Sequence, residues 1–254
     1  MAKHECNHCG TEVGLLQQIK MMDGNYLCRK CAAKTHPLFA PANTRTLAIY
    51  QGHLKQLEEG KILYEKLFLP RKKAADKSMR LTKLSGGMEV AKDIGLFAIV
   101  QKRGGFLFWG GTLYYMVFRL GDLHRYDYSS DQSLKSDGKK EVKHYIHLAF
   151  WNTAGVNECR VNISNEWNFT KSAKFFNECF GIQRNTKAGT TLKGHIENVK
   201  MAAKSIKTLV SGDSDNESKE NAVEELTQAA KNELYGDRTE WLAKADEAIK
   251  SVLE

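Results

Sequence analysis

The sequence predicts an α+β protein of 254 residues, and three observations support this fold class. The first thirty-one residues hold two Cys-x-x-Cys pairs. Between residues 86 and 182, short alternating or fully apolar runs are separated by glycine-containing turns, a pattern typical of antiparallel strands. The flanking segments repeat apolar residues at intervals of three and four, which is typical of helices. We therefore expect four parts, which cover residues 1–36, 37–85, 86–182 and 183–254.

The cysteines of the first part predict a structural zinc site. Cys6 and Cys9 form one pair, and Cys28 and Cys31 form a second pair after eighteen intervening residues. This separation is the one expected of a zinc site, and two disulfides or four free thiols are the alternative. A gap of two residues lets both sulfurs of a pair bind one ion, so that four thiolates complete a tetrahedral shell. Because such a shell leaves no open position, we expect one Zn²⁺ with a structural role.

The residues between and after the pairs predict how the ligands are placed. Met22–Tyr26 has the composition of a hairpin turn that delivers the second pair. Arg29–Lys34 is expected to form a short helix that ends before Pro37. This arrangement resembles a treble-clef or zinc-ribbon finger. About thirty residues bury too little surface to fold alone, so we expect the metal to supply much of the folding free energy.

The second part, residues 43–83, has helical periodicity. Gly60 weakens the pattern, and Pro70 is expected to end the helix. After Pro70, six basic residues are opposed by one acid, Asp76. This basic patch is a candidate contact for nucleic acid phosphates or an anionic membrane surface, and a solvated helix face is the alternative. The candidate anion-binding residues are Arg71, Lys72, Lys73, Lys77, Arg80 and Lys83.

The third part predicts seven strands followed by one helix. The helix, Phe169–Phe180, has one apolar stripe and a glycine at its C-terminal end. Seven strands and a final helix resemble, in element order, a pleckstrin-homology-like antiparallel barrel or half-barrel that the helix closes. The predicted strands are Met88–Ala91, Gly95–Val100, Phe106–Trp109, Thr112–Leu120, Leu123–Tyr128, Val142–Trp151 and Glu158–Ile163.

The N-terminal pattern also resembles a known family. The first pair is followed by Gly10, and the second pair ends the string Met-Asp-Gly-Asn-Tyr-Leu-Cys-x-x-Cys. Both features are similar to an uncharacterised zinc-ribbon family of Gram-positive bacteria and their phages. Some members carry a β-rich region with a stretch like Gly105–Gly111. The resemblance implies that the four cysteines bind zinc, and it implies no activity.

The fourth part is expected to be helical, with helices at Leu192–Val210, Lys219–Leu234 and Arg238–Leu253 and an acidic linker at 211–218. From Ser211 onward the chain has five Lys or Arg and twelve Asp or Glu, a net charge of −7, whereas the preceding residues carry +15. The tail therefore either folds over the basic body or forms an arm. We expect a partner-binding arm, with oligomerisation through these helices as a further role.

Several classes of function are disfavoured. The N-terminus has no apolar signal segment, and no run approaches the roughly twenty apolar residues of a membrane helix. Six cysteines, four of them in metal spacing, fit a reducing cytoplasm. No phosphate loop, nucleophile elbow or metalloprotease motif occurs. His144 and His147 would point to opposite faces of a strand, and Asp122 with His124 resembles an ordinary turn. We therefore predict no catalytic residues and no cofactor besides zinc.

These observations predict a cytoplasmic, non-enzymatic zinc-binding adaptor that contacts protein partners. A nucleic-acid-binding protein that uses the zinc finger and the basic patch is the alternative. A third possibility is peripheral binding to anionic lipid through the β module and the same patch.

Overall fold

The computed structural model describes residues 3–104, 111–135, 137–180, 227 and 236–254. Its contacts divide into two units, one made of residues 1–169 with 241–254 and one made of residues 170–240. The predicted strand Phe106–Trp109 and the predicted helix Leu192–Val210 lie outside the described residues. So does the predicted helix Lys219–Leu234, apart from Thr227.

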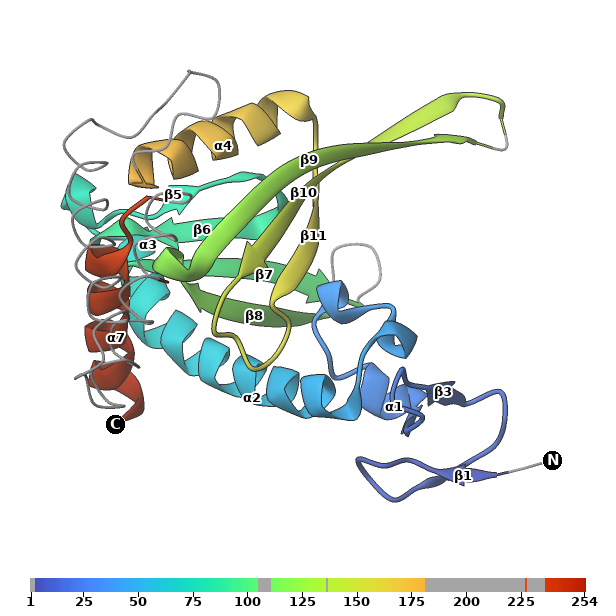
Figure 1. Ribbon diagram of the computed structural model, residues 1–254. Helices are drawn as coiled ribbons and strands as arrows, with labels where there is room; N and C mark the ends of the chain where they lie inside the picture. The colour runs from blue at the N-terminus through green and yellow to red at the C-terminus, as the bar shows by residue number, and fades with distance from the viewer. Residues whose placement is uncertain (1–2, 105–110, 136, 181–226, 228–235) are drawn as a thin grey trace, which may run out of the picture. The chain divides into compact units, whose positions relative to one another are not determined.

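Besides two short N-terminal hairpins, the first unit contains two larger antiparallel sheets that follow one another along the chain, which confirms the α+β class (Figure 1). The four-stranded sheet has the order β5-β6-β7-β8, and the three-stranded sheet has the order β11-β10-β9. The strands of the first sheet are Thr82–Lys83, Met88–Ala91, Leu96–Arg103 and Thr112–Arg119. Those of the second are Leu123–Leu134, Lys140–Phe150 and Glu158–Ile163.

The expectation was a barrel or a half-barrel, and the sheets do not form a closed barrel. Among the described residues β8 pairs only with β7, and β9 pairs only with β10. The short turn Leu120–Asp122 separates β8 from β9, and all three of its residues are buried. This turn redirects the chain, so that β9 begins a new sheet. The strand β5 was not predicted, because two residues are too few to show an alternating pattern.

The inner face of the second sheet matches the sequence pattern. Cys159, Val161 and Ile163 of β11 are buried, and the residues between them are exposed. On β10 the buried positions include Ile146 and Leu148, on the same face. The partner β11 covers β10 only from His144 onward. The distal parts of β9 and β10 therefore extend as a two-stranded ribbon (Figure 1), which explains why Val142 is exposed.

The long helix does not end where the sequence predicts. Helix α2 spans Leu47–Leu63, continues through a π-helical turn at 64–68, and joins α3, Leu69–Lys72. Gly60 lies inside α2, and Pro70 is at the start of α3, where a missing N–H is tolerated. A Cβ on Gly60 would be 2.4 Å from the Tyr115 carbonyl oxygen. The glycine is thus required by close approach of the helix to β8.

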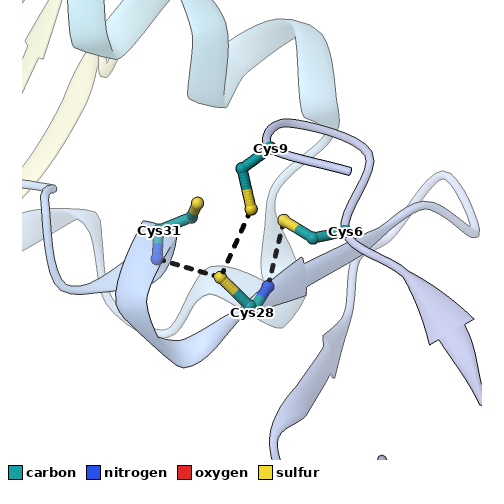
Figure 2. A group of neighbouring side chains, drawn as sticks. All are labelled: Cys6, Cys9, Cys28 and Cys31. Atoms are coloured by element: carbon teal, nitrogen blue, oxygen red, sulfur yellow. Dashed lines mark hydrogen bonds between the residues drawn. The ribbon is translucent and has the colours of Figure 1, made fainter. Parts of the chain in front are cut away.

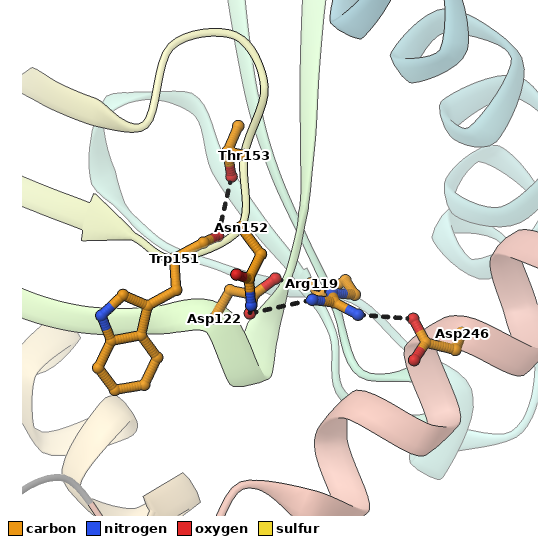
Figure 3. Close-up of polar contacts among 6 residues, drawn as sticks. All are labelled: Arg119, Asp122, Trp151, Asn152, Thr153 and Asp246. Atoms are coloured by element: carbon orange, nitrogen blue, oxygen red, sulfur yellow. Dashed lines mark hydrogen bonds and ion pairs between the residues drawn. The ribbon is translucent and has the colours of Figure 1, made fainter. Parts of the chain in front are cut away.

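The C-terminal helix α7, Thr239–Leu253, packs into the core of the first unit (Figure 1). Ala245 and Ala248 contribute to a buried cluster with Tyr64, Phe68 and Leu96. Arg119 of β8 binds Asp246 at 2.9 Å, as Figure 3 shows. The helix itself was predicted correctly. The expected partner-binding arm is wrong for it, because its apolar face is covered by the body of the same chain.

Helix α4, Glu166–Phe180, spans the boundary between the units. It begins three residues before the predicted start, and the Asn165 side chain accepts a hydrogen bond from the Asn168 N–H at 3.0 Å. Within the second unit, the Arg238 guanidinium lies 3.8 Å above the Phe180 ring. None of the described helices is long and apolar enough to cross a membrane.

Candidate metal centre

Four cysteine sulfurs meet at the N-terminal end of the first unit (Figure 2). The Sγ atoms of Cys6, Cys9, Cys28 and Cys31 all lie within 4.8 Å of one another. A tetrahedral Zn²⁺ with bonds of about 2.3 Å requires sulfur pairs about 3.8 Å apart, and Cys9 Sγ lies 3.9 Å from Cys28 Sγ. All six cysteines are free, so the alternative of two disulfides is not realised. The cluster is able to hold one metal ion, and four thiolates are a donor set typical of zinc.

The first pair lies in the turn of a very short hairpin. Strand β1, His4–Glu5, pairs with β2, Glu12–Val13. The Gly10 N–H donates to the Cys6 carbonyl at 2.8 Å, and Gly10 has a φ of +70°. Glycine adopts this left-handed conformation without steric cost. The turn therefore directs both sulfurs of the pair toward one point.

The second pair lies where a hairpin becomes a helix. Strand β3, Gln18–Lys20, pairs with β4, Tyr26–Cys28, and helix α1, Arg29–Ala32, follows directly. Cys28 is the N-cap of α1, and its sulfur accepts a hydrogen bond from the Cys31 N–H at 3.3 Å. The predicted hairpin turn and helix are both present, with the helix shorter than expected.

Hydrogen bonds join the two pairs into one site. The Cys28 N–H donates to Cys6 Sγ at 3.3 Å, as the dashed line in Figure 2 shows. The Asn7 side chain accepts from the Tyr26 N–H at 2.7 Å, and the Asn7 N–H donates to the Tyr26 carbonyl. Backbone N–H groups that donate to sulfur stabilise thiolate charge. Asn7 was not singled out from the sequence, because its role depends on a contact between separate hairpins.

The four sulfurs differ in environment. Cys9 is exposed, and the other three are buried. Cys9 Sγ lies 3.3 Å from the Thr11 hydroxyl oxygen, and hydrogen bonding to the side chain and backbone of Thr11 lowers the pKa of Cys9 to about 6. Burial raises the pKa of Cys31. Thiolate formation at Cys31 therefore depends on the compensating charge that a bound cation would supply.

The metal centre is bonded to the first sheet through helix α1. Arg103 of β7 donates to the carbonyls of Ala32 and Thr35, each at 3.0 Å. Tyr114 of β8 donates to the Ala33 carbonyl at 3.1 Å. Carbonyls at a helix C-terminus have no partner within the helix, and a cation there also complements the helix dipole. The cysteine cluster thus fixes the C-terminal end of helix α1, to which the sheet is hydrogen-bonded.

A series of buried hydrogen bonds connects the same region to helix α2. The His36 N–H donates to His53 Nε2 at 3.1 Å, and His53 Nδ1 lies 2.9 Å from Gln56 Oε1. The Val156 N–H donates to the same Gln56 oxygen at 3.2 Å. Burial lowers the pKa of His36 to about 3 and that of His53 to about 4. Both imidazoles are therefore neutral near pH 7. Sequence reasoning missed this series, since its members are far apart in the sequence.

The basic patch is partly used within the protein. Arg71 pairs with Asp93 at 2.7 Å, and Lys72 pairs with Glu89 at 3.0 Å. Arg80 donates to the Ala74 carbonyl at 2.9 Å and is exposed. Lys73, Lys77 and Lys83 are exposed, and none of them forms an ion pair with a described residue. The surface available to an anion is therefore smaller than the sequence indicates, with Arg71 and Lys72 committed to carboxylates.

The polar residues considered from the sequence have separate partners. His144 Nδ1 lies 2.7 Å from the Tyr128 hydroxyl, and His147 Nε2 lies 2.6 Å from the Ser129 hydroxyl. Asp122 is buried and accepts from Arg119 at 2.7 Å and from the Asn152 amide at 3.3 Å (Figure 3). Asp122 therefore pairs with Arg119, which also forms an ion pair with Asp246 of helix α7.

The site defines a small four-cysteine module set on an α+β body. Residues 5–53 are similar to a family described as a domain of unknown function, DUF4428. The match contains all four cysteines and ends at His53. No curated protein and no solved structure shows significant similarity to the chain.

The matched region extends past the predicted module boundary at residue 36, which stays a prediction. Contacts beyond that residue include the Tyr50 hydroxyl, which donates to the Cys31 carbonyl at 3.2 Å. The Tyr50 ring meets His8 edge to face at 5.1 Å, and Phe39 stacks on His53 at 5.0 Å. The start of helix α2 therefore packs directly against the cysteine-bearing hairpins.

Proposed function

We propose that the protein is a non-enzymatic adaptor in which one structural Zn²⁺ stabilises a module that contacts a protein partner. Zinc fits the four-thiolate donor set, and this set leaves no ligand position for a substrate. The proposal therefore gives the metal a folding role, and recognition belongs to the protein surface around it.

The observation that carries the proposal is a pair of adjacent leucines in the turn that precedes β3. Leu15 is 60% exposed and Leu16 is 83% exposed. We call these two residues the leucine tip. Single exposed apolar residues are ordinary, but adjacent ones at the end of a small metal-supported loop favour a contact site. The module is bonded to the sheet at Ala32 and Thr35, whereas the side chains of the leucine tip are exposed and available to another molecule.

Affinity purification from the native host, with mass spectrometry, tests the proposal. The wild-type protein is compared with the double variant Leu15→Ser/Leu16→Ser. Leu134→Ser is the matched control, because Leu134 is 72% exposed and lies on the β9–β10 ribbon. We expect a protein that co-purifies with the wild type and the control and is lost with the double variant. If all three recover the same proteins, the leucine tip is not the contact.

A second candidate function, nucleic acid binding, is supported by the exposed cations of the basic patch. After Arg71 and Lys72 are assigned to their ion pairs, Lys73, Lys77, Arg80 and Lys83 remain on the surface. Each phosphate contact makes affinity fall with salt, with a slope of about −0.9 per contact on duplex DNA. Lys73→Gln/Lys77→Gln should reduce that slope by about two. Absence of DNA and RNA binding at low salt would remove this candidate, and binding to anionic vesicles alone would indicate the lipid alternative.

A further inference from the structure

A pocket lined by arginines lies between the 37–45 segment and the second sheet. Its volume is about 460 Å³, and all of its lining residues belong to the first unit. We call it the arginine pocket. Its charged and aromatic lining consists of Arg45, Arg125, Arg160, His147, Tyr145 and Glu158.

Arg45 is the member without a partner for its charge. Its Nε atom is buried and has no hydrogen-bond acceptor among the described residues. Nor does its guanidinium form an ion pair within the described part of the chain. Buried donors of native proteins are nearly always bonded to protein, water or a ligand, and a charged one is costly to leave unpaired. Because Arg45 also lines the pocket, a ligand bound there would supply its guanidinium with the acceptor that the described residues do not provide.

The other two arginines differ in how firmly they are held. Arg160 contacts Asp131 at 2.5 Å, and its guanidinium lies 3.7 Å above the Tyr145 ring. Arg125 is 47% exposed and is shared between Asp127 at 3.3 Å and Glu158 at 3.7 Å. These longer distances describe a loosely held cation. Arg160 is thus committed to its neighbours, and Arg125 can turn toward a ligand.

The pKa of His147 depends on the charged side chains around the pocket. Its pKa is lowered by burial first and then by the cations Arg160 and Arg125, against the opposing carboxylates Asp127 and Asp131. The two arginines thus act on His147 as a local positive potential despite the nearby acids. An anion between the arginines would offset this potential.

We infer that the arginine pocket binds an oxyanion of the phosphate class, held by Arg45 and Arg125. Guanidinium groups bind phosphate through two parallel N–H donors, which lysine cannot reproduce. The pocket also contains Pro37, Leu38 and Tyr145, which would contact an apolar or planar group attached to the phosphate. Its source is either free inorganic phosphate or an organic phosphate monoester. This inference does not depend on the leucine tip or on a protein partner.

Calorimetric titration of the full zinc-loaded chain tests the inference with inorganic phosphate and with phenyl phosphate as probes. We expect saturable binding, with tighter binding of phenyl phosphate if the apolar lining contributes. Arg45→Gln should weaken binding about tenfold, the effect of losing one charge-assisted hydrogen bond. Lys77→Gln is the matched control, because it removes one exposed positive charge elsewhere. Binding that is equal in Arg45→Gln and wild type, or absent at millimolar probe, would overturn the inference.

The His147 imidazole provides a second readout that a general loss of stability would not imitate. Phosphate should raise the pKa of His147 measured by NMR in the wild type, and about tenfold more phosphate should be needed for the same shift in Arg45→Gln. Thermal unfolding of each variant checks that it is folded. If Arg45→Gln does not fold, Arg125→Gln replaces it, since Arg125 is half-exposed. A His147 pKa that phosphate leaves unchanged in the wild type contradicts the inference.

Discussion

At the scale of single residues, the cysteines were the most predictable feature, because ligand type and spacing are written directly in the sequence. The supporting residues were not. Asn7 and Arg103 act through contacts between segments that are 19 and 71 residues apart. A single sequence carries no signal that joins such positions. The donor atoms of the centre could thus be predicted, and the hydrogen bonds that orient them could not.

Cys28 is the ligand at which both halves of the module meet, since its N–H donates to Cys6 Sγ and its sulfur caps helix α1. Cys28→Ser should therefore reduce bound zinc from about one ion per chain to none and unfold the module. Elemental analysis and limited proteolysis of protein purified under reducing conditions measure both effects. Cys179→Ser is the control, because Cys179 lies outside the cluster. Metal-free wild-type protein would contradict the zinc assignment.

The close approach of helix α2 to β8 at Gly60 leads to a prediction about stability. Alanine normally stabilises a helix relative to glycine by about 1 kcal/mol. Here a Cβ would lie 2.4 Å from the Tyr115 carbonyl oxygen, which cannot move without disturbing β8. We expect Gly60→Ala to lower the free energy of unfolding by about 1–3 kcal/mol. Urea denaturation measures the change, and an exposed neighbour, Lys61→Ala, should be nearly neutral. A stabilised Gly60→Ala protein would show that the helix can shift.

At the scale of elements, periodicity located most helices and strands. It failed where strand pairing or packing against other elements determines the structure. The bounds of β6 and β11 were predicted to the residue. The end of the helix at Lys72 was not predicted, because Pro70 lies in the first turn of α3. The close approach to β8 that requires Gly60 also has no signal in the sequence. The amphipathic pattern of α7 indicated a buried face without indicating what covers it. Closure of a barrel likewise depends on strand pairing, which alternation does not encode.

Helix α7 should be sensitive to charge on one face only. Ala245 is fully buried in the cluster with Tyr64 and Phe68, whereas Glu247 is exposed. An arginine at position 245 would be buried without a counterion, so Ala245→Arg should destabilise the first unit by about 3 kcal/mol or more. Glu247→Arg should change stability by less than about 0.5 kcal/mol. Chemical denaturation of both variants gives the comparison. Equal stabilities would mean that α7 does not pack on the body in solution.

At the scale of the whole molecule, a series of buried hydrogen bonds holds the cysteine module, helix α2 and the loop after β10 together. His36 and His53 are neutral in the folded protein because burial lowers both pKa values. An unfolded chain takes up protons on these imidazoles below a pH of about 6.5. Stability from the neutral pair is therefore fully present above that pH, and it is lost as the pH falls toward the folded values of about 3 and about 4.

The predicted pH dependence is testable by urea denaturation between neutral pH and mildly acidic pH. Each histidine should contribute a slope of up to about 1.4 kcal/mol per pH unit in this window. Protonation of the cysteine ligands adds to the loss, so the informative quantity is the difference between wild type and His53→Gln. A glutamine can accept the His36 N–H bond without titrating. The variant should show the smaller slope, and parallel curves would refute the role of His53.

The position of α7 in the chain also has a consequence for synthesis. Tyr64, Phe68 and Leu96 come from the first hundred residues, and the alanines that complete their cluster come from the last fifteen. During translation, this part of the core therefore stays uncovered until helix α7 has been synthesised and has left the ribosome. A nascent or prematurely terminated chain exposes aromatic surface of the kind that chaperones and proteases recognise. Chains that contain helix α7 therefore cover this aromatic surface, and chains that lack it do not.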